Sequence, residues 1–98
     1  MADKQDPITR GQIFTVEDGV VVVEWYHFGD DAAYEFAEQV RLNQAGQTQI
    51  AMALGLSSTP DPDALMKILK ERFRTYFAVR EFADAQGIAY EQRTEMSP

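Results

Sequence analysis

The chain has 98 residues, of which 45% are hydrophobic and 26% charged, and it contains no cysteine. This composition is typical of one small globular domain, and the missing thiols exclude disulfides, cysteine metal sites and cysteine nucleophiles. Sixteen acidic and nine basic side chains give a formal net charge of −7, which disfavours a phosphate-binding surface. No apolar run reaches the length of a membrane span and the N-terminus has no hydrophobic signal core, so we expect a cytoplasmic protein.

The first regular structure that the sequence predicts is a β-hairpin. Residues 11–16 are rich in β-formers, and Asp18-Gly19 is a favoured pair for a two-residue hairpin loop. Val20–Phe28 follows as a long run of β-branched and aromatic residues. Alternation leaves both faces of this run mostly apolar, which predicts a central strand or a strand with a face covered by a partner chain.

A first helix is predicted over residues 32–45, where apolar residues recur at helical spacing. Asp30 is a suitable N-cap because its carboxylate can accept from the free N–H groups of the first turn. Gly46 is interpreted as the residue that ends this helix. A short helix over residues 47–56 is expected to come next.

Two further helices are predicted after residue 60. Asp61-Pro62 is typical of an N-cap followed by proline at the first helical position. One continuous helix over residues 62–86 would be about 37 Å long, which is long for this chain, so we expect a break near Phe73–Thr75. Gly87 ends the last helix.

The final predicted element is a short strand over residues 88–94, where apolar and polar residues alternate. We therefore predict an α+β fold, ββαααβ in order: an N-terminal β-hairpin, three or four helices on one face, and a C-terminal strand that completes a small antiparallel sheet by returning to the edge of the hairpin. The expected domain spans residues 10–94, between tails at 1–9 and 95–98.

Residues 47–64, QTQIAMALGLSSTPDPDA, begin like a helix-turn-helix. Ala51 and Gly55, four residues apart, suit its close packing and tight turn. Two prolines and two aspartates then fall where the DNA-reading helix should begin, and there proline disfavours helix while carboxylates repel phosphate. We interpret the stretch as a short helix, a turn and the cap of the next helix.

Basic residues are concentrated late in the chain. Residues 1–66 hold eleven acidic and three basic side chains, whereas residues 67–98 hold five acidic and six basic ones. A solvated helix face is the simpler interpretation of this basic stretch. The alternative is a patch, including Lys70 and Arg74, that contacts an anionic partner.

Few side chains suggest chemistry. His27 with Asp30 and Asp31 could in principle bind a metal, but both aspartates are explained as helix-start residues, so His27 is expected to pack beside Trp25. Glu24 lies among apolar strand residues and would need a partner such as Arg10, Arg72 or Arg80 if its face is covered. The alternative interpretation is an outward-facing Glu24 at the edge of the sheet. We predict no catalytic residue, no cofactor and no metal, and do not expect an enzyme.

The aromatic residues give the strongest functional indication. In each of the adjacent pairs Trp25-Tyr26 and Tyr76-Phe77, the two side chains cannot both point inward, so one of each pair is expected at a surface. Aromatic residues are enriched at protein interfaces. The predicted interaction residues are therefore Trp25, Tyr26, Tyr76, Phe77, Lys70 and Arg74.

Three functions remain open from the sequence. The first is a small non-catalytic protein–protein interaction or regulatory module, expected to be homodimeric. The second is an acidic inhibitor or nucleic-acid mimic, of the kind a phage could encode, that occupies a basic groove of a host protein. Its carboxylates would be those of Glu17, Asp18, Asp30, Asp31, Glu35 and Glu38. The third is a nucleic-acid binder related to the helix-turn-helix.

Overall fold

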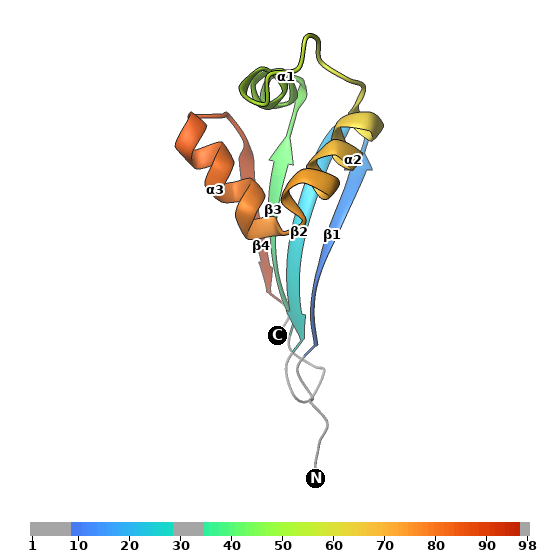
Figure 1. Ribbon diagram of the computed structural model, residues 1–98. Coiled ribbons are helices and arrows are strands. Elements are labelled where there is room, and N and C mark those ends of the chain that lie inside the picture. The colour runs from blue at the N-terminus through green and yellow to red at the C-terminus, as the bar shows by residue number, and fades with distance from the viewer. Residues whose placement is uncertain (1–8, 29–34, 97–98) are drawn as a thin grey trace.

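Figure 1 shows a computed structural model of the chain, which describes residues 9–28 and 35–96. Four strands form one antiparallel sheet in the order β1-β2-β3-β4, and three helices cover one of its faces. This confirms the predicted α+β fold with an N-terminal hairpin, three helices and a C-terminal strand that completes the sheet. The elements are β1 (Thr9–Glu17), β2 (Val20–Phe28), β3 (Glu35–Leu42), α1 (Gln44–Ala53), α2 (Pro62–Phe73), α3 (Tyr76–Gln86) and β4 (Glu91–Met96).

The hairpin forms as the sequence predicts. Asp18 and Gly19 both have positive φ, 50° and 78°, and Glu17 pairs with Val20 on either side of them. Two consecutive positive φ angles are the geometry of a type I′ turn, whose twist matches that of the flanking strands. The strand with two apolar faces, β2, lies inside the sheet between β1 and β3, as expected.

The prediction of a helix over residues 32–45 is wrong, because residues 35–42 form the strand β3. Alternation explains the difference: Val40 and Leu42 are fully buried under the helices, whereas Gln39 and Arg41 lie on the opposite face. The strand also pairs with the outer edge of β2, so backbone groups beside this apolar strand gain partners. Asp30, the expected N-cap of that helix, lies outside the described residues.

The position of the C-terminal strand also needs correction. It begins at Glu91 rather than at residue 88, and it pairs with β3 instead of the edge of the hairpin. The cause is the additional strand, which separates the hairpin from the C-terminal segment. In this arrangement β1 and β4 are the two edges of the sheet.

Each helix starts with a side-chain cap. In each case a side-chain oxygen accepts from the backbone N–H three residues later. The acceptors are the side-chain amide oxygen of Asn43, the carboxylate of Asp61 and the hydroxyl of Thr75. The expected break between the last two helices is confirmed: Arg74 has a φ of 70° and separates α2 from α3. Gly87 ends α3 in the left-handed conformation, as predicted.

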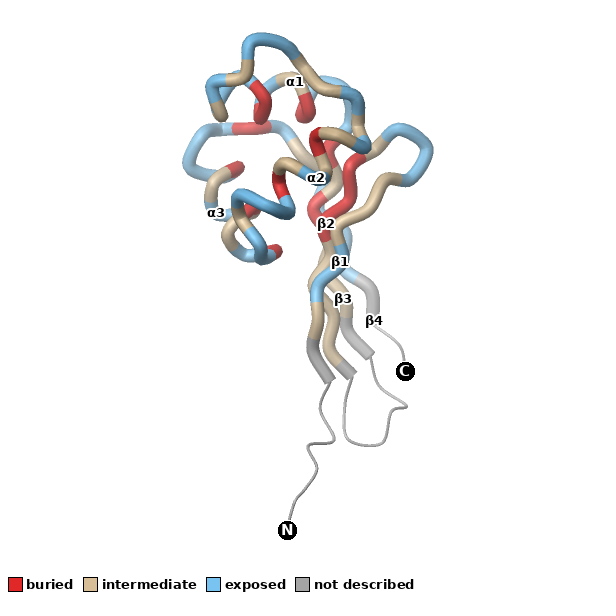
Figure 2. The backbone as a smooth tube through the Cα atoms, turned by 45° about the vertical axis from the view of Figure 1, so that its right-hand side comes forward, coloured by how far each residue is buried: buried red, intermediate tan, exposed pale blue. Residues whose placement is uncertain are grey.

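The core lies between the helices and the covered face of the sheet. Its buried side chains are Val21, Val23, Val40, Leu42, Ile50, Leu65, Leu69, Tyr76, Val79, Ala83 and Ile88. Buried Gln47 ties α1 to this layer, since its Nε2 donates to the carbonyl oxygens of Gly19 (2.7 Å) and Leu42 (2.9 Å). Figure 2 shows that the buried segments gather at one end of the molecule, and that the strands continue beyond the helices. Among the described helices, none combines the length and apolar character needed to cross a bilayer.

Candidate interaction surface

Three of the six predicted interaction residues meet at the start of α3. Trp25 lies on the helix-covered face of β2, and its ring centroid is 5.5 Å from that of Phe77. Tyr76 meets Phe77 edge to face at 5.1 Å. Tyr76 is fully buried whereas Phe77 is 52% exposed, so this adjacent pair divides between core and surface as the sequence predicted.

Gln12 of β1 fixes the turn that presents Phe77. Its Oε1 accepts from the backbone N–H of Tyr76, and its Nε2 donates to the carbonyl oxygen of Arg74 at 3.4 Å. One side chain therefore satisfies both an N–H in the first turn of α3 and the backbone that precedes it. The same residue pairs with Trp25 across the hairpin, so the strand and the helix position the two aromatic rings together.

A shallow hollow opens beside these rings. It is lined by Gly11, Gln12, Trp25, Thr75 and Phe77, and its volume is about 320 Å³. We call this set of residues the Phe77 hollow. Residues of β1, of β2 and of the start of α3 contribute to it, and its volume is large enough for one side chain of a second molecule.

Tyr76, Glu38 and Arg80 form a polar triad next to Phe77. The hydroxyl of Tyr76 donates to Oε1 of Glu38 (3.1 Å), and Arg80 pairs with the same oxygen at 3.1 Å. Burial and then the charge of Glu38 raise the pKa of Tyr76 to about 12. The triad connects α3 to β3, and it keeps Glu38 engaged on the covered face of the sheet.

Raising the pH is expected to destabilise the protein through Tyr76. The folded state holds the Tyr76 proton up to about pH 12, whereas the unfolded state releases it near pH 10. The stabilisation of the folded state by the protonated Tyr76 hydroxyl is therefore complete below pH 10 and is lost as the pH rises to 12. The loss should be on the order of 1–2 kcal/mol. Urea unfolding compared between about pH 9 and about pH 11.5 measures it. Tyr76→Phe should show a smaller alkaline loss than the natural chain, and equal losses would contradict this origin.

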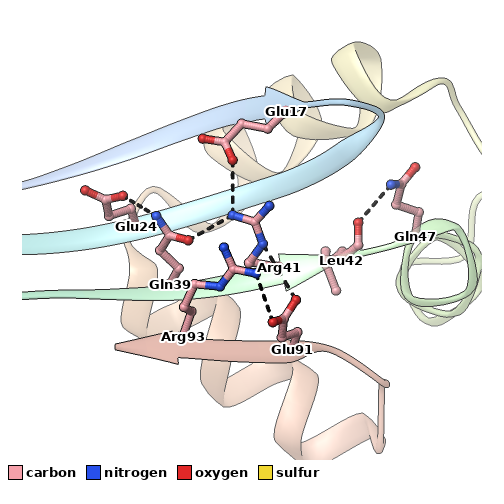
Figure 3. Close-up of polar contacts among 8 residues, drawn as sticks. All are labelled: Glu17, Glu24, Gln39, Arg41, Leu42, Gln47, Glu91 and Arg93. Carbon is pink, nitrogen blue, oxygen red and sulfur yellow. Dashed lines mark hydrogen bonds and ion pairs between the residues drawn. The ribbon is translucent and has the colours of Figure 1, made fainter. Parts of the chain in front are cut away.

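The other face of the sheet carries a polar network and not a core. Figure 3 shows Arg41 at its centre, with its guanidinium 3.1 Å from Glu17 and 2.9 Å from the Gln39 oxygen. It also reaches Glu91 at 3.7 Å. We call this side, which the helices leave uncovered, the open face.

Glu24 belongs to this network. Its carboxylate accepts from Nε2 of Gln39 at 2.6 Å. The partner of Glu24 is thus the side-chain amide of Gln39 in β3. Arg72 and Arg80 were expected as partners only if this face were covered. The Arg10 side chain lies outside the described part. The outward orientation, the other interpretation of Glu24, is the one observed.

Tyr26 lies on the open face, away from the other aromatic interaction residues. A Cβ on Gly11 would overlap the Tyr26 ring, so the phenol lies against β1 where the glycine leaves space. Trp25 and Tyr26 therefore point to opposite faces, as alternation predicts, and only Trp25 joins the Phe77 hollow.

Lys70 and Arg74 are exposed near the end of α2. The N–H of Arg74 donates to the carbonyl of Lys70, and the Arg74 carbonyl accepts from Gln12. Arg74 thus stands at the rim of the Phe77 hollow, with Lys70 one turn earlier.

His27 stacks on Trp25, with ring centroids 6.1 Å apart and planes within 3°. This confirms the expected packing of His27 beside Trp25. Asp30 and Asp31, the other members of the metal hypothesis, are not in the described segments. Within 9–28 and 35–96, no three metal-binding side chains gather in one place.

The carboxylates of the mimic hypothesis do not share one face. Glu17 pairs with Arg41 on the open face, whereas Glu38 pairs with Arg80 under the helices. Asp18 lies in the hairpin turn. The side chains of the other three, Asp30, Asp31 and Glu35, lie outside the described part.

Gln12 was absent from the predicted site although a signal existed. Alternation places it on the helix-covered face with Phe14 and Val16, where a polar side chain can bond to a helix that crosses the strand. Its partner in α3 is 64 residues away in the chain, so sequence spacing alone could not identify the contact.

Comparison with known proteins finds no family model that matches the chain, and neither a curated protein nor a solved structure that is similar to it.

Proposed function

We propose that this protein is a non-catalytic interaction module that works by contact with another protein, with the Phe77 hollow as the centre of the contact. The observation that carries the proposal is the position of Phe77, 52% exposed and packed on Trp25 at the start of α3. A large aromatic side chain that stays at the surface beside a hollow is a typical anchor of a protein interface.

The contacts around the hollow support a preorganised surface. Gln12 holds the first turn of α3, and Trp25 supports the ring of Phe77 from β2. Such support lowers the entropy that ordering the surface would cost on binding. Rigid aromatic anchors of this kind bind better than side chains that must be immobilised first.

The border of the hollow suggests the chemistry of the partner. Arg74, whose carbonyl accepts from Gln12, is exposed next to Thr75 of the hollow, and Lys70 is exposed one turn earlier on α2. A partner segment with one apolar side chain flanked by carboxylates would match the aromatic floor and the basic rim. We propose this class of segment as the ligand.

Several carboxylates that do not line the Phe77 hollow have structural contacts, which supports a non-catalytic role for the protein. Glu38 holds Tyr76 and Arg80, Glu24 accepts from Gln39, and Asp84 accepts from the hydroxyl of Tyr90 at 2.6 Å. Each of these carboxylates joins two elements or two turns of the fold. Their contacts account for them without a reaction.

Phe77→Ala is expected to abolish partner capture while the domain stays folded. Because the ring is half exposed, its removal should cost about 1 kcal/mol of stability or less, whereas loss of an interface anchor costs 2 kcal/mol or more of binding. Affinity capture with quantitative mass spectrometry measures the effect. Met52→Ala, which removes another exposed apolar side chain, is the matched control. Equal recovery of the same proteins by both variants and the natural chain would refute the proposal.

We also propose that the module is a homodimer. A domain of this size buries a modest core, so association adds stability. Ile13, 44% exposed on the open face of β1, is a second apolar position at the surface, on the opposite face of the sheet from the Phe77 ring. Sedimentation across a range of concentrations tests this part of the proposal.

A further inference from the structure

We infer that the homodimer forms by antiparallel pairing of β1 with β1 of a second copy, which joins the two sheets into one continuous sheet. The inference rests on the proposed homodimer and names its interface. It follows from the chemistry of the two sheet edges, from the direction of the backbone groups on β1, and from the self-complementary side-chain pattern of that strand.

The two edges of the sheet differ in charge. One edge of the sheet is β4, where exposed Glu91 and Arg93 alternate with uncharged residues. Charged side chains are a common means of preventing edge-to-edge pairing. On the other side, residues 11–16 of β1 carry no charge and include exposed Ile13. The protection found on β4 is thus missing from β1.

The backbone of β1 is positioned to accept another strand. In the described part of the chain β1 pairs only with β2. Because a two-residue loop makes Glu17 and Val20 a hydrogen-bonded pair, odd-numbered residues of β1 bond to β2. The N–H and C=O groups of Gln12, Phe14 and Val16 therefore point to the outer side, which Figure 1 shows at the edge of the sheet.

One register makes the strand complementary to itself. With the two-fold axis at Ile13, this residue lies opposite its own copy as a non-hydrogen-bonded pair on the open face. Gln12 then lies opposite Phe14 of the second copy, so the outward backbone groups meet.

This register also places the proposed binding surfaces close together. Gly11 and Gln12 line the Phe77 hollow and are next to Ile13 in β1. The hollows of the two copies would therefore flank the two-fold axis on the helix-covered side. A partner with two apolar segments could occupy both, which would strengthen its binding through the linkage of the two contacts.

Ile13→Lys is expected to convert the dimer to a monomer. It removes the central apolar pair and sets two like charges opposite each other, so the dimer dissociation constant should rise about tenfold or more. Met52→Lys is the matched control, because Met52 is 71% exposed on α1 and the charge change is the same. Sedimentation of the full chain measures both variants. A dimer unaffected by Ile13→Lys overturns the inference but leaves the homodimer, whereas a monomeric natural chain overturns both.

Single cysteines test the register independently, since the chain has no natural cysteine. In Ile13→Cys the two Cα atoms would lie about 4.5–5.5 Å apart, within the range of a disulfide, so oxidation should give a cross-linked dimer. In Thr15→Cys, also on the open face, the two residues would be offset by about 13 Å and should not cross-link. Cross-linking of Thr15→Cys but not of Ile13→Cys overturns the register, and so does the absence of cross-linking in both.

Discussion

Gly46→Ala is expected to lower the free energy of unfolding by about 2 kcal/mol, although alanine favours helix over glycine by about 1 kcal/mol. Gly46 lies in the first turn of α1, where its N–H donates to the Asn43 side chain at 3.0 Å. A Cβ there would overlap the carbonyl oxygen of Ala89 and approach Leu42 Cδ2 to 3.1 Å. Because a backbone oxygen cannot rotate away, α1 or the chain before β4 would have to shift.

Gly55→Ala provides the control for this prediction. Gly55 has a φ of 80°, but no atom lies within 4 Å of the position of its Cβ. Its substitution should therefore cost only the strain of a left-handed alanine, about 1 kcal/mol. Chemical denaturation measures both changes. If Gly46→Ala proved neutral or stabilising, the close approach of α1 to Ala89 would be contradicted.

The hairpin was predictable because its signals are local. Asp18-Gly19 favours positive φ at both positions, and the β-branched run of Val20–Phe28 has few alternatives to a strand. Caps are equally local: Asp61 and Gly87 have the predicted roles because each depends on residues within one turn of the helix.

The strand β3 was not predictable in this way. Its sequence, EFAEQVRL, contains alanine, glutamate, glutamine, arginine and leucine, all of which favour helices. Helical spacing of Phe36, Ala37 and Val40 competes with alternation of Val40 and Leu42. The tertiary context decides between them, because β2 offers an unpaired edge and the helices cover Val40 and Leu42. Because a helix was wrongly predicted before it, Gly46 was expected to end a helix, whereas it lies in the first turn of α1.

The candidate site was predictable in part. Adjacency alone required that Tyr76 and Phe77 divide between core and surface, and they do. The separation of Tyr26 from Trp25 follows from alternation. Which members of the aromatic set meet depends on the crossing of α3 over the hairpin, and the clamp by Gln12 joins residues far apart in sequence. Distant contacts of this kind leave no periodic signal in one sequence.

Ala51→Lys is expected to unfold the domain. Ala51 is 1% exposed on α1 and follows the fully buried Ile50. A lysine there must either bury its ammonium group, which costs several kcal/mol, or displace α1 from the sheet. Small domains have about 5–15 kcal/mol of total stability, so this single change removes a large part of it. Circular dichroism and thermal unfolding measure the loss.

Asp61→Asn is the contrasting change in the second half of residues 47–64, and it should leave the stability nearly unchanged. Asp61 is exposed, and its carboxylate accepts from the N–H of Ala64 at 2.8 Å as the N-cap of α2. Asparagine caps helices about as well as aspartate, so stability should change by about 0.5 kcal/mol or less. The contrast separates two roles within residues 47–64: Ala51 is fixed by packing, whereas Asp61 needs only an acceptor oxygen. Equal tolerance of both substitutions would show that α1 does not belong to the core.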